Sequence, residues 1–139
     1  NNTNLSIFDF SAYDAVADCV DTLEAKLLLA QACQGGQPYL VSSMGAGNRM
    51  DPGQLRLGDL YETSACPLAR RMRKACREKG IPALRVLYSL EEPRKIVTER
   101  RDGRHSPASV SFVPPVAGMM IAGDIIRFLL QQAPAPAPG

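Results

Sequence analysis

The fold is decided by a strand that runs into a glycine loop, residues 40–52, LVSSMGAGNRMDP. Residues 39–43 are rich in amino acids that favour a pleated surface, so we expect a strand over this range. Gly45 and Gly47 can adopt backbone angles that other residues avoid, and the closing Asp-Pro favours a turn. Open α/β sheets bind ligands where such strands end. An ordinary strand exit has the same pattern, so the preceding residues must decide between the two interpretations.

Those residues predict a strand, a helix and a second strand. Residues 15–20 are an apolar run between two aspartates, which is typical of a buried parallel strand. Residues 22–34 carry apolar side chains at helical spacing, and glycines stop the helix. With the strand at 39–43 the unit takes about 30 residues, the size of a βαβ crossover. The fold class is therefore α/β with parallel strands, as in Rossmann-like proteins.

The rest of the chain continues this alternation. Ser64 is a possible helix cap, and Pro67 suits a first helical turn. A last helix is apolar except for a narrow polar stripe, which predicts that it is mostly buried. Residues 91–107 are polar and charged and are expected to form a loop. The elements expected are a strand at 54–58, a helical turn at 59–63, a helix at 68–79, a strand at 84–89, a helix at 116–130 with the stripe Asp124, Arg127 and Gln131, and a proline-rich tail at 132–139.

The composition indicates a chain with a packed core and two differently charged regions. It has 139 residues, 45% of them hydrophobic, and a net charge of +2. Residues 1–65 carry eight acids and three bases, whereas residues 66–104 carry five acids and twelve bases. An acidic first half beside a basic middle predicts two surfaces with different partners. No apolar run approaches the roughly 20 residues that cross a bilayer, so no membrane partner is expected.

Two further features bear on context. The chain starts without methionine at Asn1 and is expected to be a piece of a longer protein. Its four cysteines show no CxxC spacing, and His105 is the only histidine, which argues against a zinc site. We expect reduced thiols in a cytoplasmic protein, with Cys19, Cys33 and Cys76 in the core. Cys66 precedes a helix, where its thiol is either activated by the helix dipole or simply packed.

Acidic residues follow the first strand. Alternation turns residues i and i+3 to opposite faces, so the strand must end between Asp18 and Asp21. Asp21 then lies in the exit loop, where it either binds Mg²⁺ bridged to a nucleotide phosphate or merely caps the next helix. Lys26, one turn later, could reach a phosphate or pair with Asp21 or Thr22.

Several segments, in this order and spacing, resemble the ThiF/MoeB/HesA superfamily of ubiquitin-activating-type adenylating enzymes. Within it the resemblance is strongest to one branch, the tRNA threonylcarbamoyladenosine dehydratases, also called TcdA or CsdL. It covers roughly residues 13–131, as the C-terminal portion of a ThiF-type domain. The segments are residues 13–26, YDAVADCVDTLEAK; 42–52, SSMGAGNRMDP; 59–69, DLYETSACPLA; 88–93, YSLEEP; and 111–118, SFVPPVAG.

The resemblance implies an ATP-dependent enzyme. Such proteins adenylate a carboxylate; in this branch the carboxylate of threonylcarbamoyladenosine in tRNA is activated and cyclises with loss of water. By position Asp21 matches the family's Mg²⁺-ATP aspartate and Lys26 a basic residue that supports the site. ATP, Mg²⁺, tRNA, a homodimer and a sulfur-carrier or cysteine desulfurase partner are implied as cofactors and partners.

The chain also departs from the family. The family's GxGxxG phosphate loop, its Asn-x-x-Arg-Gln element and a dimer-crossing arginine precede the aspartate motif, and this sequence contains none of them. Without the phosphate loop a backbone N–H cradle is missing. We therefore expect these 139 residues alone to be inactive. The segment matching residues 84–89 also lacks the cysteine that some relatives carry, which leaves the catalytic residues unassigned.

A basic helix face suits contact with a phosphate backbone. A solvated helix face has the same composition. Two other functions stay open: an activator of a ubiquitin-like sulfur carrier for thiamine or molybdopterin synthesis, and a dimerisation or scaffold fragment. The density of basic residues favours RNA over a carrier-protein tail. The residues expected to bind nucleic acid are Arg70, Arg71, Arg73, Lys74 and Arg77, and the basic run continues with Lys79, Arg94, Lys95, Arg100, Arg101 and Arg104.

Overall fold

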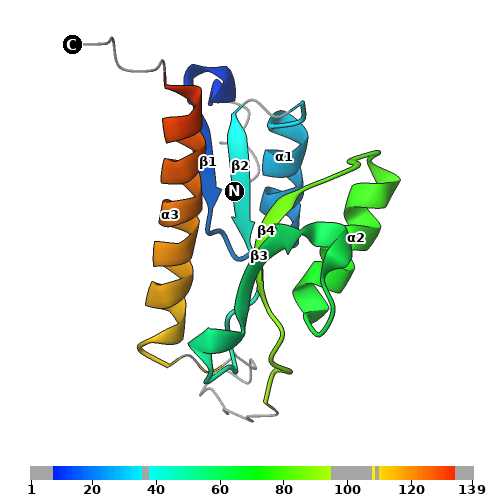
Figure 1. The fold of residues 1–139 in the computed structure, drawn as a ribbon. Coiled ribbons are helices and arrows are strands. Elements are labelled where there is room, and N and C mark those ends of the chain that lie inside the picture. Colours follow the sequence, from blue (N-terminus) through cyan, green and yellow to red (C-terminus); the bar gives the residue numbers. More distant parts are fainter. Residues whose placement is uncertain (1–7, 36–37, 95–107, 109, 134–139) are drawn as a thin grey trace, which may run out of the picture.

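The structure, a computed structural model, describes residues 8–35, 38–94, 108 and 110–133. It has three layers (Figure 1). A four-stranded sheet lies in the middle, with helix α3 on one face and helices α1 and α2 on the other. The predicted α/β class is therefore confirmed.

The sheet has the strand order β1-β2-β4-β3. The first three of these strands run parallel, and β3 pairs antiparallel with β4. The predicted strand at 39–43 is found unchanged, and each other predicted helix or strand is found within three residues of its expected ends. The elements are β1 Ala15–Asp18, α1 Leu23–Ala32, β2 Tyr39–Ser43, β3 Leu55–Asp59, α2 Pro67–Glu78, β4 Arg85–Ser89 and α3 Val113–Gln132, with 3-10 turns at Phe10–Ala12, Pro52–Gln54 and Leu60–Glu62.

The central strand β2 contributes to a separate core on each face of the sheet. Leu40 packs under α1 and α2, in a cluster that includes Met72. Val41 points the other way and packs against Ile121 of α3. Successive strand residues face opposite sides, so a strand covered on both faces reads as a continuous apolar run. This explains why the strand could be recognised from the sequence.

Helix α3 is less buried than its composition predicted. Its polar residue Asp124 is only 7% exposed, because it turns toward the sheet. Large apolar side chains point away from the sheet instead, including Met119 at 76% exposed and Leu130 at 69%. The expectation of a mostly buried helix was wrong, because one face of the helix covers the sheet while apolar side chains on its other side are exposed.

The length of α3 also corrects an expectation. By length and composition alone its 20 residues could cross a membrane, whereas no apolar run of that size was expected. In this fold, however, the helix uses Val113, Ala117 and Ile121 to cover the sheet and buries Asp124 against it. Covering one face of a sheet is a sufficient reason for this apolar stripe.

Candidate functional site

A crevice of about 820 Å³ opens at the carboxyl ends of the parallel strands. The loops after β1 and β2 form two of its walls, and the N-termini of α2 and α3 contribute Pro67 and Pro114. This is the edge at which open α/β sheets bind ligands. The residues that matter most for its chemistry are Asp21, Lys26, Gly45, Gly47, Arg49 and Leu68.

Asp21 lies where the strand argument placed it. Strand β1 ends at Asp18, and Asp21 is exposed in the loop that lines the crevice. Thr22 is the N-cap of α1 and makes no side-chain cap bond, so Asp21 does not act as the cap. Among the described residues no hydrogen bond or ion pair uses the Asp21 carboxylate. Its oxygens therefore remain available to a cation or a ligand.

Lys26 pairs with a carboxylate that the sequence did not suggest. Its Nζ lies 3.1 Å from both carboxylate oxygens of Asp18, and both residues are 1% exposed. Asp18 also accepts from the Ser42 hydroxyl at 2.5 Å and from the Val20 amide at 3.1 Å. Of the two alternatives left open for Lys26, pairing with Asp21 or Thr22 is therefore wrong. A buried ammonium held this way fixes the floor of the crevice, and a role toward phosphate stays a prediction.

The glycine loop is held by Arg49, which is 3% exposed. Its Nε donates to the Glu91 carbonyl at 3.1 Å, and its Nη1 donates to the Gly45 carbonyl. The Glu91 carboxylate in turn accepts from the backbone amides of Met50 and Asp51 at 3.0 and 2.9 Å. Sequence reasoning assigned Arg49 no role; a basic residue inside a glycine loop at a strand end was the available signal.

Asn48 joins three parts of the chain beside the crevice. It has a positive φ of 58°, which asparagine tolerates better than most residues. Its amide donates to the Ala108 carbonyl at 2.8 Å, and its side-chain oxygen accepts from the Ala108 amide at 2.6 Å. Its carbonyl accepts from the Arg94 amide at 2.8 Å. The residues that flank 95–107 therefore meet at one position of the glycine loop.

A family model described as ThiF family matches residues 2–138. The chain belongs to the ThiF family. The resemblance drawn from the sequence motifs is thus confirmed. The chain is 34% identical over 136 residues to tRNA threonylcarbamoyladenosine dehydratase of Bacillus subtilis (strain 168), an alignment that covers 89% of this chain and 53% of the relative. It is also 36% identical over 81 residues to tRNA threonylcarbamoyladenosine dehydratase 2 of Saccharomyces cerevisiae, covering 58% and 18%.

Solved structures share the fold of this ThiF-family chain. E. coli TcdA in complex with AMP superposes with a TM-score of 0.77 at 21% identity, covering 94% of this chain and 54% of that one. The same enzyme in complex with ATP superposes with a TM-score of 0.62, covering 88% and 54%. The chain thus spans about half the length of the Bacillus relative and of these solved chains.

The cysteines of this ThiF-family chain are mostly packed. Cys66 is 3% exposed and, instead of Ser64, is the N-cap of α2; its Sγ accepts from the Ala69 amide at 3.5 Å. Burial raises the pKa of the Cys76 thiol to about 11 and also raises the pKa of Cys33. Cys19 was expected in the core, but it is exposed and lines the crevice, because β1 ends at Asp18, directly before it.

The basic face predicted for RNA is largely present on α2. Arg70, Arg71 and Lys74 are exposed. Arg77 is also exposed and stacks its guanidinium over the Tyr61 ring, 5.3 Å from the centroid. Arg73 differs: its guanidinium donates to the backbone carbonyl (2.8 Å) and the hydroxyl of one residue, Thr63, so it anchors the preceding turn. The later basic residues Lys95, Arg100, Arg101 and Arg104 lie outside the described part of the chain.

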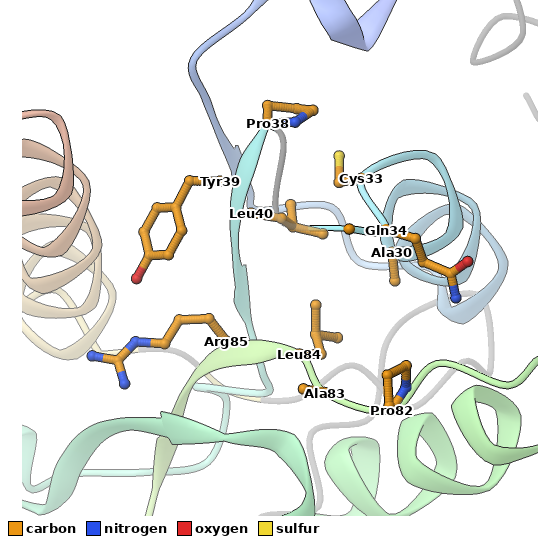
Figure 2. Close-up of a pocket in the computed structure, with 11 residues that line it drawn as sticks. Ala30, Cys33, Gln34, Pro38, Tyr39, Leu40, Pro82, Ala83, Leu84 and Arg85 are labelled. Atoms are coloured by element: carbon orange, nitrogen blue, oxygen red, sulfur yellow. The ribbon is translucent and has the colours of Figure 1, made fainter. Parts of the chain in front are cut away.

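At the opposite end of the sheet a smaller cavity of about 260 Å³ lies between α1 and the first residues of β2 and β4 (Figure 2). Figure 2 shows Tyr39 and Arg85 pointing toward α3 and away from Cys33. Both donate to Asp124, at 2.7 Å from Tyr39 and 2.8 and 3.1 Å from Arg85. The Arg85 hydrogen bonds, aided by Tyr39, hold the pKa of Asp124 below its usual range. This cluster fastens α3 to the sheet.

Proposed function

We propose that this chain is the C-terminal portion of an ATP-dependent enzyme that dehydrates threonylcarbamoyladenosine in tRNA. The observation that carries the proposal is the 34% identity to the Bacillus subtilis dehydratase over 89% of this chain. The crevice supports it, because its exposed carboxylate lies at the edge where α/β sheets bind nucleotides.

In the proposed reaction the substrate carboxylate attacks the α-phosphorus of ATP, and pyrophosphate leaves. The carbamoyl oxygen or nitrogen of the same molecule then attacks the activated carboxyl carbon and closes a ring. A proton is released, and AMP leaves with the former carboxylate oxygen. Water is lost overall, because that oxygen departs on AMP. Positioning and charge neutralisation are the protein's main contributions to such a transfer.

Asp21 is the residue that would hold Mg²⁺. Mg²⁺ prefers one or two carboxylates together with phosphate oxygens, and Asp21 offers one carboxylate without a described partner. No cluster of three or more metal-ligating side chains occurs among the described residues, so the remaining ligands would be phosphate oxygens and water. Lys26 would support the site from the floor of the crevice, with its ammonium group held in place by Asp18.

The exposed bases of α2 support tRNA as the partner. The test is filter binding of tRNA to the 139-residue chain at a series of salt concentrations. Each neutralised phosphate contributes about 0.7–0.9 to the slope of log K against log salt. We expect a steep slope that flattens when Arg70, Arg71 and Lys74 become alanine, and not when Arg56, on the β3 edge, does. A slope that is already flat in the unmodified chain would favour activation of a sulfur-carrier protein instead.

The proposal also covers the oligomeric state of the protein and its cellular location. The intact protein is a cytoplasmic homodimer, and the exposed apolar side chains of α3, among them Met119 and Ile126, support self-association. Light scattering with and without ATP measures this. The isolated chain is expected neither to bind ATP tightly nor to hydrolyse it, and measurable hydrolysis would contradict that.

A further inference from the structure

One nitrogen of the glycine loop is left without a partner. The Arg49 residue is only 3% exposed, and two of its nitrogens donate to carbonyl oxygens. Its third nitrogen, Nη2, is the one buried side-chain nitrogen or oxygen of the described residues that makes no hydrogen bond. Buried polar atoms nearly always have partners, so an exception calls for a physical explanation.

Among the residues that the structure describes, no carboxylate pairs with Arg49. Both described partners of its guanidinium are neutral carbonyl groups. The Glu91 side chain, whose backbone carbonyl accepts from Arg49, is turned to the amides of Met50 and Asp51 and to Arg94 at 3.8 Å. A buried cation with neutral partners leaves positive potential in the crevice, which suits an anionic ligand.

The start of α2 lies against the same spot. A Cβ built on Gly45 would lie 3.8 Å from Arg49 Nη1 and 3.9 Å from both Cys66 Sγ and Leu68 Cβ. The first-turn amides of a helix lack partners inside the helix. In this turn Pro67 has no N–H and the Ala69 amide faces Cys66 Sγ, whereas the Leu68 amide has no partner among the described hydrogen bonds. α2 has 12 residues, and its positive end favours anions.

We propose that Arg49 and the first turn of α2 form an oxyanion subsite in the crevice. It binds a carboxylate or a phosphate group, with Arg49 Nη2 and the Leu68 amide as donors. A guanidinium N–H donates to a carboxylate oxygen as readily as to a phosphate oxygen, which makes the two chemistries equivalent here. The subsite goes beyond the roles proposed for Asp21 and Lys26, and it rests on the proposed function only in the choice of a carboxylate probe.

The test is an NMR titration of the ¹⁵N-labelled 139-residue chain, without nucleotide or tRNA. One arm uses inorganic phosphate and the other N-carbamoylthreonine, both at constant ionic strength with chloride. We expect saturable shifts of the Leu68 amide and of the Arg49 side-chain nitrogens in at least one arm. The tighter arm identifies the source of the anion. Because no ATP chemistry is measured, failure here is separate from failure of the proposed function.

Two variants sharpen the titration. Arg49→Lys keeps the charge but has one nitrogen in place of three, so it cannot hold both carbonyl groups and the anion at once, and we expect at least tenfold weaker binding. Arg56→Lys is the matched control, since Arg56 also donates to backbone carbonyls but lies on the β3 edge away from the crevice, and its binding should equal that of the unmodified chain. Absence of saturable shifts in both arms, or undiminished binding by a folded Arg49→Lys, overturns the proposal. If Arg49→Lys does not fold, the Arg49 side-chain signals of the unmodified chain decide alone.

Discussion

Replacing Lys26 with methionine tests the buried pair under the crevice. The substitution keeps most of the side-chain volume but removes the ammonium that bridges both oxygens of Asp18 at 3.1 Å. The carboxylate then keeps only Ser42 and the Val20 amide as donors, at 1% exposure. Removing one partner of a buried ion pair costs about 3–5 kcal/mol, because an uncompensated charge remains. A domain of this size is stable by only about 5–15 kcal/mol.

The free energy of unfolding is measured by urea titration with far-UV circular dichroism. With an m value of about 1.5 kcal/mol/M, the midpoint of Lys26→Met should fall by about 2–3 M. The matched control is Lys74→Met, because Lys74 is 83% exposed and its pair with Glu78 spans 4.0 Å. We expect that control to change the stability by less than about 0.5 kcal/mol.

A double variant separates the charge from the packing. Asp18→Asn together with Lys26→Met leaves no buried charge, so it should recover much of the loss. A loss below about 1 kcal/mol for Lys26→Met would refute the reasoning. So would a double variant no more stable than the single one, since the cost would then come from packing alone.

Three further results are expected. The Arg85 and Tyr39 bonds lower the folded-state pKa of Asp124, so their stabilisation is present above the ordinary value of 3.8 and is lost as pH falls through the folded value; Asp124→Asn should cost about 2 kcal/mol near neutral pH and little in acid, by urea titration at several pH values. Native alkylation should modify exposed Cys19 first and spare Cys76, whose pKa of about 11 keeps it a thiol, as mass spectrometry would show. Mn²⁺ should broaden the amide signal of Asp21, and Asp21→Asn should abolish this without lowering stability, because the side chain is exposed.

Much of the fold could be predicted because it depends on local patterns. The short apolar run of β2, bounded by proline before it and glycine after it, is typical of a buried strand. The burial of α3 could not be predicted in this way. Asp124 contacts Arg85, 39 residues earlier in the chain, and only this tertiary pairing turns Asp124 inward, whereas Arg127 and Gln131 are exposed.

The residues of the candidate site also differ in whether local sequence or tertiary packing determines their positions. The position of Asp21 followed from strand alternation, which needs no information beyond the strand itself. The partner of Lys26 depends on how α1 packs back over β1. The sequence alone therefore could not favour Asp18 over Asp21 and Thr22, which are closer to Lys26 along the chain. The unpaired nitrogen of Arg49 is visible only once every neighbouring donor and acceptor is placed.

Asn48 has a consequence for how such sequences diverge. It anchors Arg94 and Ala108 at the same point, so the stretch between them begins and ends at one fixed position. The entropy of closing such a span grows only with the logarithm of its length. We therefore expect the framework around the crevice to accept insertions and deletions between residues 94 and 108, provided that an asparagine remains to receive both ends.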